Sequence, residues 1–209
     1  HQREVLEELG VSRIGVVRGY HKRKFSFPGI YYYDNPEYSS RGILHSLTIG
    51  MDFLIDSTLI LYADTLFRRS ILDRMVQTPG DLILAIDRAI PSRKRRGKGR
   101  VVEAVSLQHK TAKQAFWIIR HLSRNLPDSQ QDGEYIGVAL IRERAIEKVK
   151  RLLTELDADP PKAGADLLNL FQAWIDSGEK LYGMMVSSEE WMDVDTFEDY
   201  REAGSRFES

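Results

Sequence analysis

The strongest constraint on the fold is a set of continuous apolar runs that recur along the chain and alternate with helix-like segments. These runs occupy residues 58–62, 81–86, 134–141 and 180–186. Each is short enough to be a strand and lacks polar alternation, which indicates burial on both faces. Strands of this kind predict a three-layer, Rossmann-like α/β fold with a mixed, mostly parallel sheet and helices on both faces.

Weaker patterns account for the rest of the chain. Further strands are expected at residues 13–17 and 30–33, and helices at residues 2–9, 39–54, 68–75, 143–156, 165–177 and 195–207. Residues 100–108 and 115–119 are typical of an antiparallel section. We expect a single domain over residues 1–209, in which residues 90–133 form an inserted loop and antiparallel section.

The composition excludes several classes of protein. The chain has no cysteine, which rules out disulfides and thiolate metal sites. No apolar run approaches the ~20 residues that span a bilayer, and the charged first residues do not resemble a signal peptide. Lys and Arg number 30 against 31 Asp and Glu, so net charge gives no steering toward nucleic acid or membrane. We expect a soluble, cytoplasmic protein with neither as a partner.

Basic residues crowd one short stretch, at positions 93, 94, 95, 96, 98 and 100. Such runs are usually solvated loops, and the glycines at positions 97 and 99 favour that interpretation. A lid that clamps phosphate groups over an active site is the alternative. No aromatic residues alternate with the basic ones, which argues against recognition of nucleic acid by this run.

Asp64 is the first candidate for chemistry, because it follows the apolar run Leu59–Tyr62 where that strand leaves the sheet. Ligands of open α/β sheets bind outside the carboxyl ends of the strands. A carboxylate there can hold Mg²⁺, which prefers one or two carboxylates together with phosphate oxygens. The alternative is that Asp64 caps the helix expected from Arg68 onward.

Asp193 and Asp195 alternate along an extended segment, so we expect both side chains on one face. Like charges held close together repel unless a cation or a proton lies between them. The alternative is capping, in which Asp195 or Thr196 opens the helix that follows. Together with Asp64, the pair predicts a three-carboxylate site that binds Mg²⁺ and orients a nucleoside triphosphate for in-line attack.

The chain is dense in tyrosine between residues 20 and 38, with Tyr31, Tyr32 and Tyr33 in one strand. Aromatic faces can hold a quaternary ammonium group or an amine by cation–π attraction. That would suit an acceptor that resembles choline or aminoethyl compounds. Packing of an edge strand is the alternative interpretation, since alternation places only some of these rings on the same face.

Several short motifs follow one another along nearly the whole chain. They lie in Val11–Tyr20, Tyr33–Tyr38, His45–Leu47, Leu61–Phe67, Ile86–Arg88, Gly133–Gly137 and Trp191–Tyr200. They include a Gly-Tyr strand end, an Asn-Pro pair, an Ala-Asp strand end, Gly-Glu-Tyr-Ile-Gly and Asp-Val-Asp-Thr. In this order they resemble the cytidylyltransferase branch of the sugar-nucleotidyltransferase superfamily, and within it the phosphocholine and phosphonate cytidylyltransferases.

The resemblance implies an α/β fold of the nucleotide-diphospho-sugar transferase type and an Mg²⁺-dependent activity. CMP would pass from CTP to a phosphorylated or phosphonylated small molecule, with release of pyrophosphate. It implies Asp64, Asp193 and Asp195 as metal ligands, with Asp64 and Asp195 as catalytic residues. It also implies that Asn35, Tyr33 and Glu134 line the nucleotide or acceptor pocket.

Two features depart from the family pattern. The family begins with a Gly-rich loop, whereas His1 here falls in the helix that follows it, so we expect that segment to be absent from this chain. Arg41-Gly-Ile43 also replaces a pair of asparagines. Two alternative functions therefore remain: a non-catalytic nucleotidyltransferase-like binding domain, and a sugar-1-phosphate nucleotidyltransferase. A homodimer is compatible with either.

Overall fold

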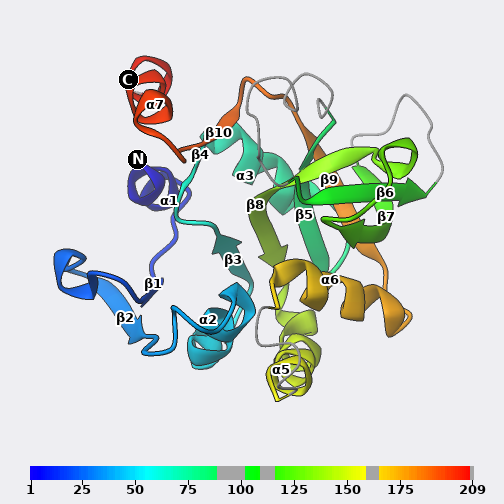
Figure 1. Ribbon diagram of the computed structural model, residues 1–209, viewed down its shortest axis with the longest axis horizontal. Helices are drawn as coiled ribbons and strands as arrows, with labels where there is room; N and C mark the ends of the chain where they lie inside the picture. Colours follow the sequence, from blue (N-terminus) through cyan, green and yellow to red (C-terminus); the bar gives the residue numbers. More distant parts are fainter. Residues whose placement is uncertain (89–101, 109–115, 159–164, 208–209) are drawn as a thin grey trace. The chain divides into compact units, whose positions relative to one another are not determined.

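The computed structural model describes residues 1–88, 102–108, 116–158 and 165–207 (Figure 1). The chain forms two compact units. The first comprises residues 1–10, 59–141 and 180–209, and the second comprises residues 11–58 and 142–179. The basic run at 93–100 and much of the section expected over 90–133 lie outside the described residues.

The first unit is built on a six-stranded sheet in the order β3-β8-β5-β9-β7-β6. Its strands are β3 (Thr58–Leu61), β5 (Leu82–Asp87), β6 (Ala104–Gln108), β7 (Phe116–Ser123), β8 (Gly133–Ile141) and β9 (Leu181–Val186). Because β6 also pairs with β8, five of these strands close into a small ring. Helix α3 (Arg69–Gln77) packs against β5 and β9.

The prediction of a mostly parallel sheet is wrong for this unit. Among the described pairings with a defined register, β5–β9 is parallel, whereas β5–β8, β6–β7, β6–β8 and β7–β9 are antiparallel. All nine residues of β8 are buried. A closed ring of strands buries its inward side chains whatever the strand direction, so burial on both faces did not require parallel neighbours.

A second, shorter sheet in the same unit was not expected from the sequence. Strand β4 (Thr65–Phe67) pairs antiparallel with β10 (Trp191–Asp193). Phe67 and Trp191 are register partners and both are fully buried. Helices α1 (Gln2–Glu8) and α7 (Phe197–Phe207) belong to this unit, and α7 packs beside β4.

Within the described residues, the second unit contains a two-stranded parallel sheet and three α-helices. Strand β1 (Ile14–Arg18) pairs with β2 (Ile30–Asp34), with Ile14 opposite Ile30. The single helix expected at 39–54 is instead α2 (Ile43–Ile49) followed by the 3₁₀ turn η2 (Met51–Phe53), because Gly50 ends α2.

Helix α2 packs on α5 (Glu143–Asp157) and α6 (Leu167–Asp176), and α5 packs on α6. A capping box between Asp166 and Asn169 opens α6. An ion pair from Arg41 to Asp157 (2.7 Å) and a contact between His45 Nδ1 and the Asp157 carboxylate (2.8 Å) join α2 and the turn before it to the end of α5. None of the helices in the described residues combines the length and apolar character that crossing a bilayer requires.

Glu190 fixes the turn that leads into β10. Arg74 of α3 donates to both of its carboxylate oxygens, at 2.8 and 2.9 Å, and Ser70 Oγ and the Ser187 amide donate as well. These bonds, led by those from Arg74, lower the pKa of Glu190 to about 2. The start of β10 is therefore tied to α3 by a partly buried, bidentate ion pair.

We predict that Glu190→Gln lowers the free energy of unfolding at pH 7 by at most about 3 kcal/mol. Because the folded-state pKa lies below the unfolded value, the stabilisation is present above about pH 4.5 and is lost as pH falls toward about 2. Urea unfolding of both proteins at several pH values measures this difference. A gap between wild type and variant that stays constant from pH 7 to about pH 2 would contradict the assignment.

Candidate active site

A cavity of about 370 Å³ lies within the first unit. It is lined by Tyr62, Asp64, Glu103, Arg124, Glu134, Tyr135, Ile136, Gly137, Asp193 and Asp195. These residues come from the ends of β3, β7 and β8, from the segment before β6, and from β10 with the residues after it. The three aspartates expected to bind Mg²⁺ and Glu134 therefore line one cavity. That they bind a ligand stays a prediction.

The β4–β10 pairing places Asp64 beside the two C-terminal aspartates. Thr65 is the register partner of Asp193, and its Oγ1 donates to Asp193 Oδ1 at 3.1 Å. One residue further along, the Val194 amide donates to the Asp64 carbonyl at 2.9 Å. Asp64 thus lies opposite the residue that separates Asp193 from Asp195, although more than a hundred residues intervene in the chain.

Asp64 does not cap a helix. Helix α3 begins at Arg69, and Arg68 holds its N-cap position without a side-chain bond. Asp64 instead occupies the exposed turn between β3 and β4, and its side chain makes no hydrogen bond or ion pair with the described residues. Gln2 of α1 holds this turn, because its Nε2 donates to the carbonyls of Tyr62 (2.8 Å) and Thr65 (2.6 Å).

Asp195 is also free of a capping role. Thr196 and Asp199 form the reciprocal cap at the start of α7: Thr196 accepts from the Asp199 amide at 3.1 Å, and Asp199 Oδ2 accepts from the Thr196 amide at 2.9 Å. The capping alternative therefore applies to Thr196. The Asp195 side chain is exposed and has no hydrogen bond or ion pair within the described residues.

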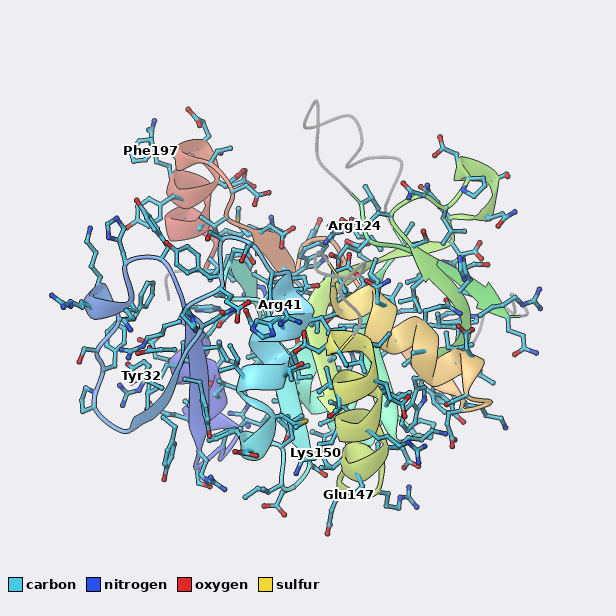
Figure 2. The ribbon with its side chains drawn as sticks, turned by 60° about the horizontal axis from the view of Figure 1, so that its bottom comes forward. Tyr32, Arg41, Arg124, Glu147, Lys150 and Phe197 are labelled. Carbon is cyan, nitrogen blue, oxygen red and sulfur yellow. The ribbon has the colours of Figure 1, made fainter. Side chains whose placement is uncertain are left out.

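Five of the lining side chains are carboxylates, and the basic side chain among the described lining residues is that of Arg124. Arg124 is labelled in Figure 2. Arg124 Nη2 contacts Glu103 Oε1 at 2.6 Å, and Tyr62 Oη donates to Glu103 Oε2 at 3.1 Å. Burial, together with the negative charge of Glu103, raises the pKa of Tyr135 well above its usual value. Such a cavity repels a polyphosphate unless a cation accompanies it.

No group of three acidic or histidine side chains within the described residues converges closely enough to hold a metal ion. A preformed three-carboxylate centre is therefore not present in this part of the chain. Mg²⁺ does not need one, since it usually keeps several waters and binds one or two carboxylates plus substrate phosphates. Asp64 and Asp195 fit that requirement as exposed carboxylates on a shared cavity.

The other expected pocket residues, Asn35 and Tyr33, belong to the second unit. The buried Asn35 side chain donates to Ser46 Oγ at 3.0 Å and accepts from the Glu37 amide at 2.8 Å. These bonds give it a structural role in the turn after β2. The Tyr33 ring packs edge-on against Phe53, with centroids 6.3 Å apart. Binding of nucleotide or acceptor by either residue stays a prediction.

The neighbouring tyrosines hold cations of this chain. The guanidinium of Arg13 lies 5.3 Å from the Tyr31 ring and 4.8 Å from the Phe53 ring. On the other face of the strand, Arg18 lies 4.0 Å from the Tyr32 ring. Packing of these rings with internal arginines therefore accounts for the tyrosine-rich strand, without an ammonium ligand.

Six of the residues that line the cavity were not predicted as site residues from the sequence: Tyr62, Glu103, Arg124, Tyr135, Ile136 and Gly137. Gly137 and Tyr135 lie inside a motif that was recognised, and Tyr62 is two positions from Asp64, so their neighbourhood carried a signal. No sequence motif pointed to Glu103 or Arg124. They reach the cavity from the chain before β6 and after β7, and only the closure of the ring brings those segments to β8.

Gly137 shapes the cavity wall. It has a φ of +79°, and a Cβ there would lie 2.6 Å from the Tyr62 ring and 2.9 Å from Thr65 Oγ1. The Tyr62 amide donates to its carbonyl at 2.9 Å. A glycine at this position therefore allows β8 to approach the turn that carries Asp64.

We predict that Gly137→Ala is destabilising by about 1–3 kcal/mol more than Gly10→Ala, as measured by chemical unfolding. Gly10 is the matched control, because its φ of +84° is similar but nothing lies within 4 Å of its Cβ position. Gly10→Ala loses unfolding free energy only because alanine is strained at a positive φ. The additional loss in Gly137→Ala therefore measures the clash with Tyr62. Equal losses for the two variants would show that β8 does not need this close approach.

Neither protein-family models nor the sequences of curated proteins match this chain. Solved structures do match it. CTP:phosphocholine cytidylyltransferase from Streptococcus pneumoniae has a TM-score of 0.70 at 15% identity, over 98% of this chain and 82% of that one. The inositol-1-phosphate CTP transferase from T. maritima matches with a TM-score of 0.69 at 13% identity, over 95% of this chain and 76% of that one. Apo UDP-glucose pyrophosphorylase matches with a TM-score of 0.72 at 14% identity, over 97% of this chain and 83% of that one.

Identities this low establish a shared fold and no more. The chain has the mixed α/β fold of these nucleotidyltransferases. The cytidylyl enzymes and the UDP-glucose enzyme match it about equally well, so the comparison does not separate the cytidylyltransferase branch from the sugar-nucleotide branch.

Proposed function

We propose that this protein is a metal-dependent nucleotidyltransferase that joins a nucleoside monophosphate to an anionic small molecule and releases pyrophosphate. The observation that carries the proposal is the placement of Asp64 and Asp195. Both are exposed, neither side chain has a partner within the described residues, and both line one acidic cavity. Its nucleotidyltransferase fold makes this chemistry the simplest use of two such carboxylates.

Asp64 and Asp195 would hold Mg²⁺ at this cavity, and Asp193 lines the same cavity beside them. When bound, the ion supplies neutralising charge for the α-phosphate and the pyrophosphate leaving group. The contribution of the protein is positioning, because phosphoryl chemistry of this kind needs alignment and electrostatics rather than a covalent nucleophile. An anionic oxygen of the acceptor attacks the α-phosphorus, and the bond from that phosphorus to the β-phosphate oxygen breaks.

Arg124 would bind a phosphate or phosphonate group of the substrate. Its guanidinium offers a planar set of donors that matches these anions, and Glu103 holds it at the cavity wall in the meantime. A substrate anion would accept hydrogen bonds from the Arg124 N–H groups that now contact Glu103. Tyr62 keeps a bond to Glu103, which limits the cost of that exchange.

The cavity volume of about 370 Å³ suits a small molecule rather than a polymer. We favour CTP as donor and a phosphorylated or phosphonylated small molecule as acceptor, because the ordered motifs resemble the phosphocholine and phosphonate cytidylyltransferases. The match to apo UDP-glucose pyrophosphorylase, with a TM-score of 0.72, supports a sugar-1-phosphate acceptor equally. A non-catalytic binding domain is the third candidate.

A panel of the common nucleoside triphosphates with phosphocholine, 2-aminoethylphosphonate and sugar 1-phosphates separates these candidates. We expect Mg²⁺-dependent pyrophosphate release with CTP and one of the first two acceptors. Release only with a sugar 1-phosphate would move the assignment to the sugar-nucleotide branch. No release with any pair, from the full-length protein, would favour a binding domain.

We predict that Asp64→Asn and Asp195→Asn each lower the rate of pyrophosphate release by at least about 100-fold. The amide removes the charge that attracts the cation but keeps the shape of the side chain. Asp73→Asn is the matched control, because Asp73 lies on α3 with a half-exposed side chain and pairs only loosely with Arg69 at 3.6 Å. Circular dichroism establishes that all three variants fold, and full activity in either cavity variant would overturn the proposal.

We predict that Arg124→Ala raises the KM for the substrate whose anion it binds by about 10-fold or more, with a smaller change in kcat. Initial rates with one substrate saturating and the other varied identify which substrate is affected. Arg120→Ala is the control, since Arg120 is an exposed residue of β7, the strand that Arg124 follows. An unchanged KM for both substrates would exclude Arg124 from recognition.

A further inference from the structure

The connection between β1 and β2 in the second unit is an exposed segment with an unusual composition. Residues 21–29 read His-Lys-Arg-Lys-Phe-Ser-Phe-Pro-Gly, and every one of them is exposed. The 3₁₀ turn η1 (Lys22–Lys24) begins it. We call residues 21–29 the basic-aromatic segment; Figure 1 shows it projecting from the two strands.

The charge of the segment is uniformly positive. Lys22, Arg23 and Lys24 are consecutive, and no Asp or Glu occurs between residues 19 and 33. The nearest acid, Asp34, is paired with Arg18 at 2.9 Å and with Lys22 at 3.1 Å. Arg23 and Lys24 make no ion pair with the described residues. Two cations at the tip of the segment are therefore available to a partner.

Two phenylalanines follow the basic residues directly. Phe25 is 51% exposed and Phe27 is 53% exposed. Phe25 has an extended backbone, in which side chains two positions apart project to the same side. Single exposed apolar residues are ordinary, but a pair of large aromatic side chains beside three cations is typical of an interaction surface.

The segment is held open by its own contacts. Arg18 Nη1 donates to the Phe25 carbonyl at 2.7 Å, and the Arg18 guanidinium lies on the Tyr32 ring. The Phe27 amide donates to Tyr32 Oη at 2.6 Å (Tyr32 is labelled in Figure 2). The backbone of both phenylalanines is therefore tied to β1 and β2, and both rings are about half exposed.

We propose that the basic-aromatic segment binds the surface of an anionic phospholipid membrane. Phe25 and Phe27 would enter the boundary between head groups and acyl chains, while Arg23 and Lys24 contact the anionic head groups. Apolar burial and attraction to anionic lipid add in such contacts, and each basic residue near the surface contributes. This surface binding goes beyond the proposed catalytic function and does not depend on it.

An anionic surface fits the segment better than a single-stranded nucleic acid does. Nucleic-acid sites track a backbone along a basic groove and stack successive bases on aromatic rings. Here the cations gather within one three-residue turn. The ring of Tyr20, the residue before the segment, already contacts the His21 ring, with centroids 3.9 Å apart. The expectation that the protein has no membrane partner rested on net charge, which does not describe this local concentration of cations.

Co-sedimentation of the full chain with vesicles tests the proposal. We expect binding to phosphatidylcholine vesicles that contain about 30 mol % phosphatidylglycerol, and no binding to phosphatidylcholine alone. Binding should weaken in about 0.5 M NaCl, because salt screens the charge contribution. Absence of binding to the anionic vesicles at low salt would overturn the proposal.

Paired variants localise the contact. Arg23→Glu/Lys24→Glu and Phe25→Ser/Phe27→Ser should each lower vesicle partitioning at least about 10-fold. The matched controls are Arg151→Glu, which is 65% exposed on α5, and Phe197→Ser/Tyr200→Ser, which are 71% and 67% exposed on α7. Both controls should bind like wild type, with unchanged thermal midpoints throughout.

Two further outcomes would also overturn the proposal. One is vesicle binding that the segment variants leave intact while a control variant abolishes it. The other is binding of a labelled oligoribonucleotide that the segment variants abolish, without any vesicle binding. Pyrophosphate release measured on the same variants in the absence of vesicles should equal that of wild type, so failure of this proposal is distinguishable from failure of the catalytic one.

Discussion

The candidate active site depends on one short strand pairing, that of β4 with β10. Its register partners Phe67 and Trp191 are both fully buried, and Trp191 Nε1 donates to the buried Asp87 at 2.8 Å. Truncation of a buried aromatic side chain of this size costs about 3–5 kcal/mol, so the pairing resists displacement. The same register places Asp64 and the Asp193–Asp195 segment side by side at the polar end of the pair.

The electrostatics of the cavity follow from that placement. Carboxylates from four separate segments face one small volume, and Arg124 compensates only part of their charge through Glu103. Repulsion between like charges is strong where water is partly excluded, so the described lining disfavours a triphosphate that no cation accompanies. The acidic lining thus disfavours a polyphosphate alone and favours its metal complex, which gives the proposed activity its dependence on metal.

Apolar runs and helical periodicity in the sequence predicted most of the strands and helices, including β1 and β2, whereas the pairing of the three-residue strands β4 and β10 was not predicted. The apolar runs at 58–62, 81–86, 134–141 and 180–186 all became strands. Their directions could not be predicted, since closure of the ring buries antiparallel strands as completely as a parallel sheet would.

The sequence predicted only part of the candidate site. Asp64, Asp193 and Asp195 were recognised from motifs, whereas β4 and β10, at three residues each, are too short to show any alternation. Glu103 and Arg124 join the cavity through tertiary closure, for which no local pattern exists.

A crystal structure with Mn²⁺ and a non-hydrolysable CTP analogue tests the central claim most directly, because anomalous scattering locates the metal without reference to activity. We predict an anomalous peak within coordination distance of carboxylate oxygens from both Asp64 and Asp195, with remaining ligands from phosphate and water. A bound nucleotide whose metal contacts neither residue, or a peak at another site, would contradict the account.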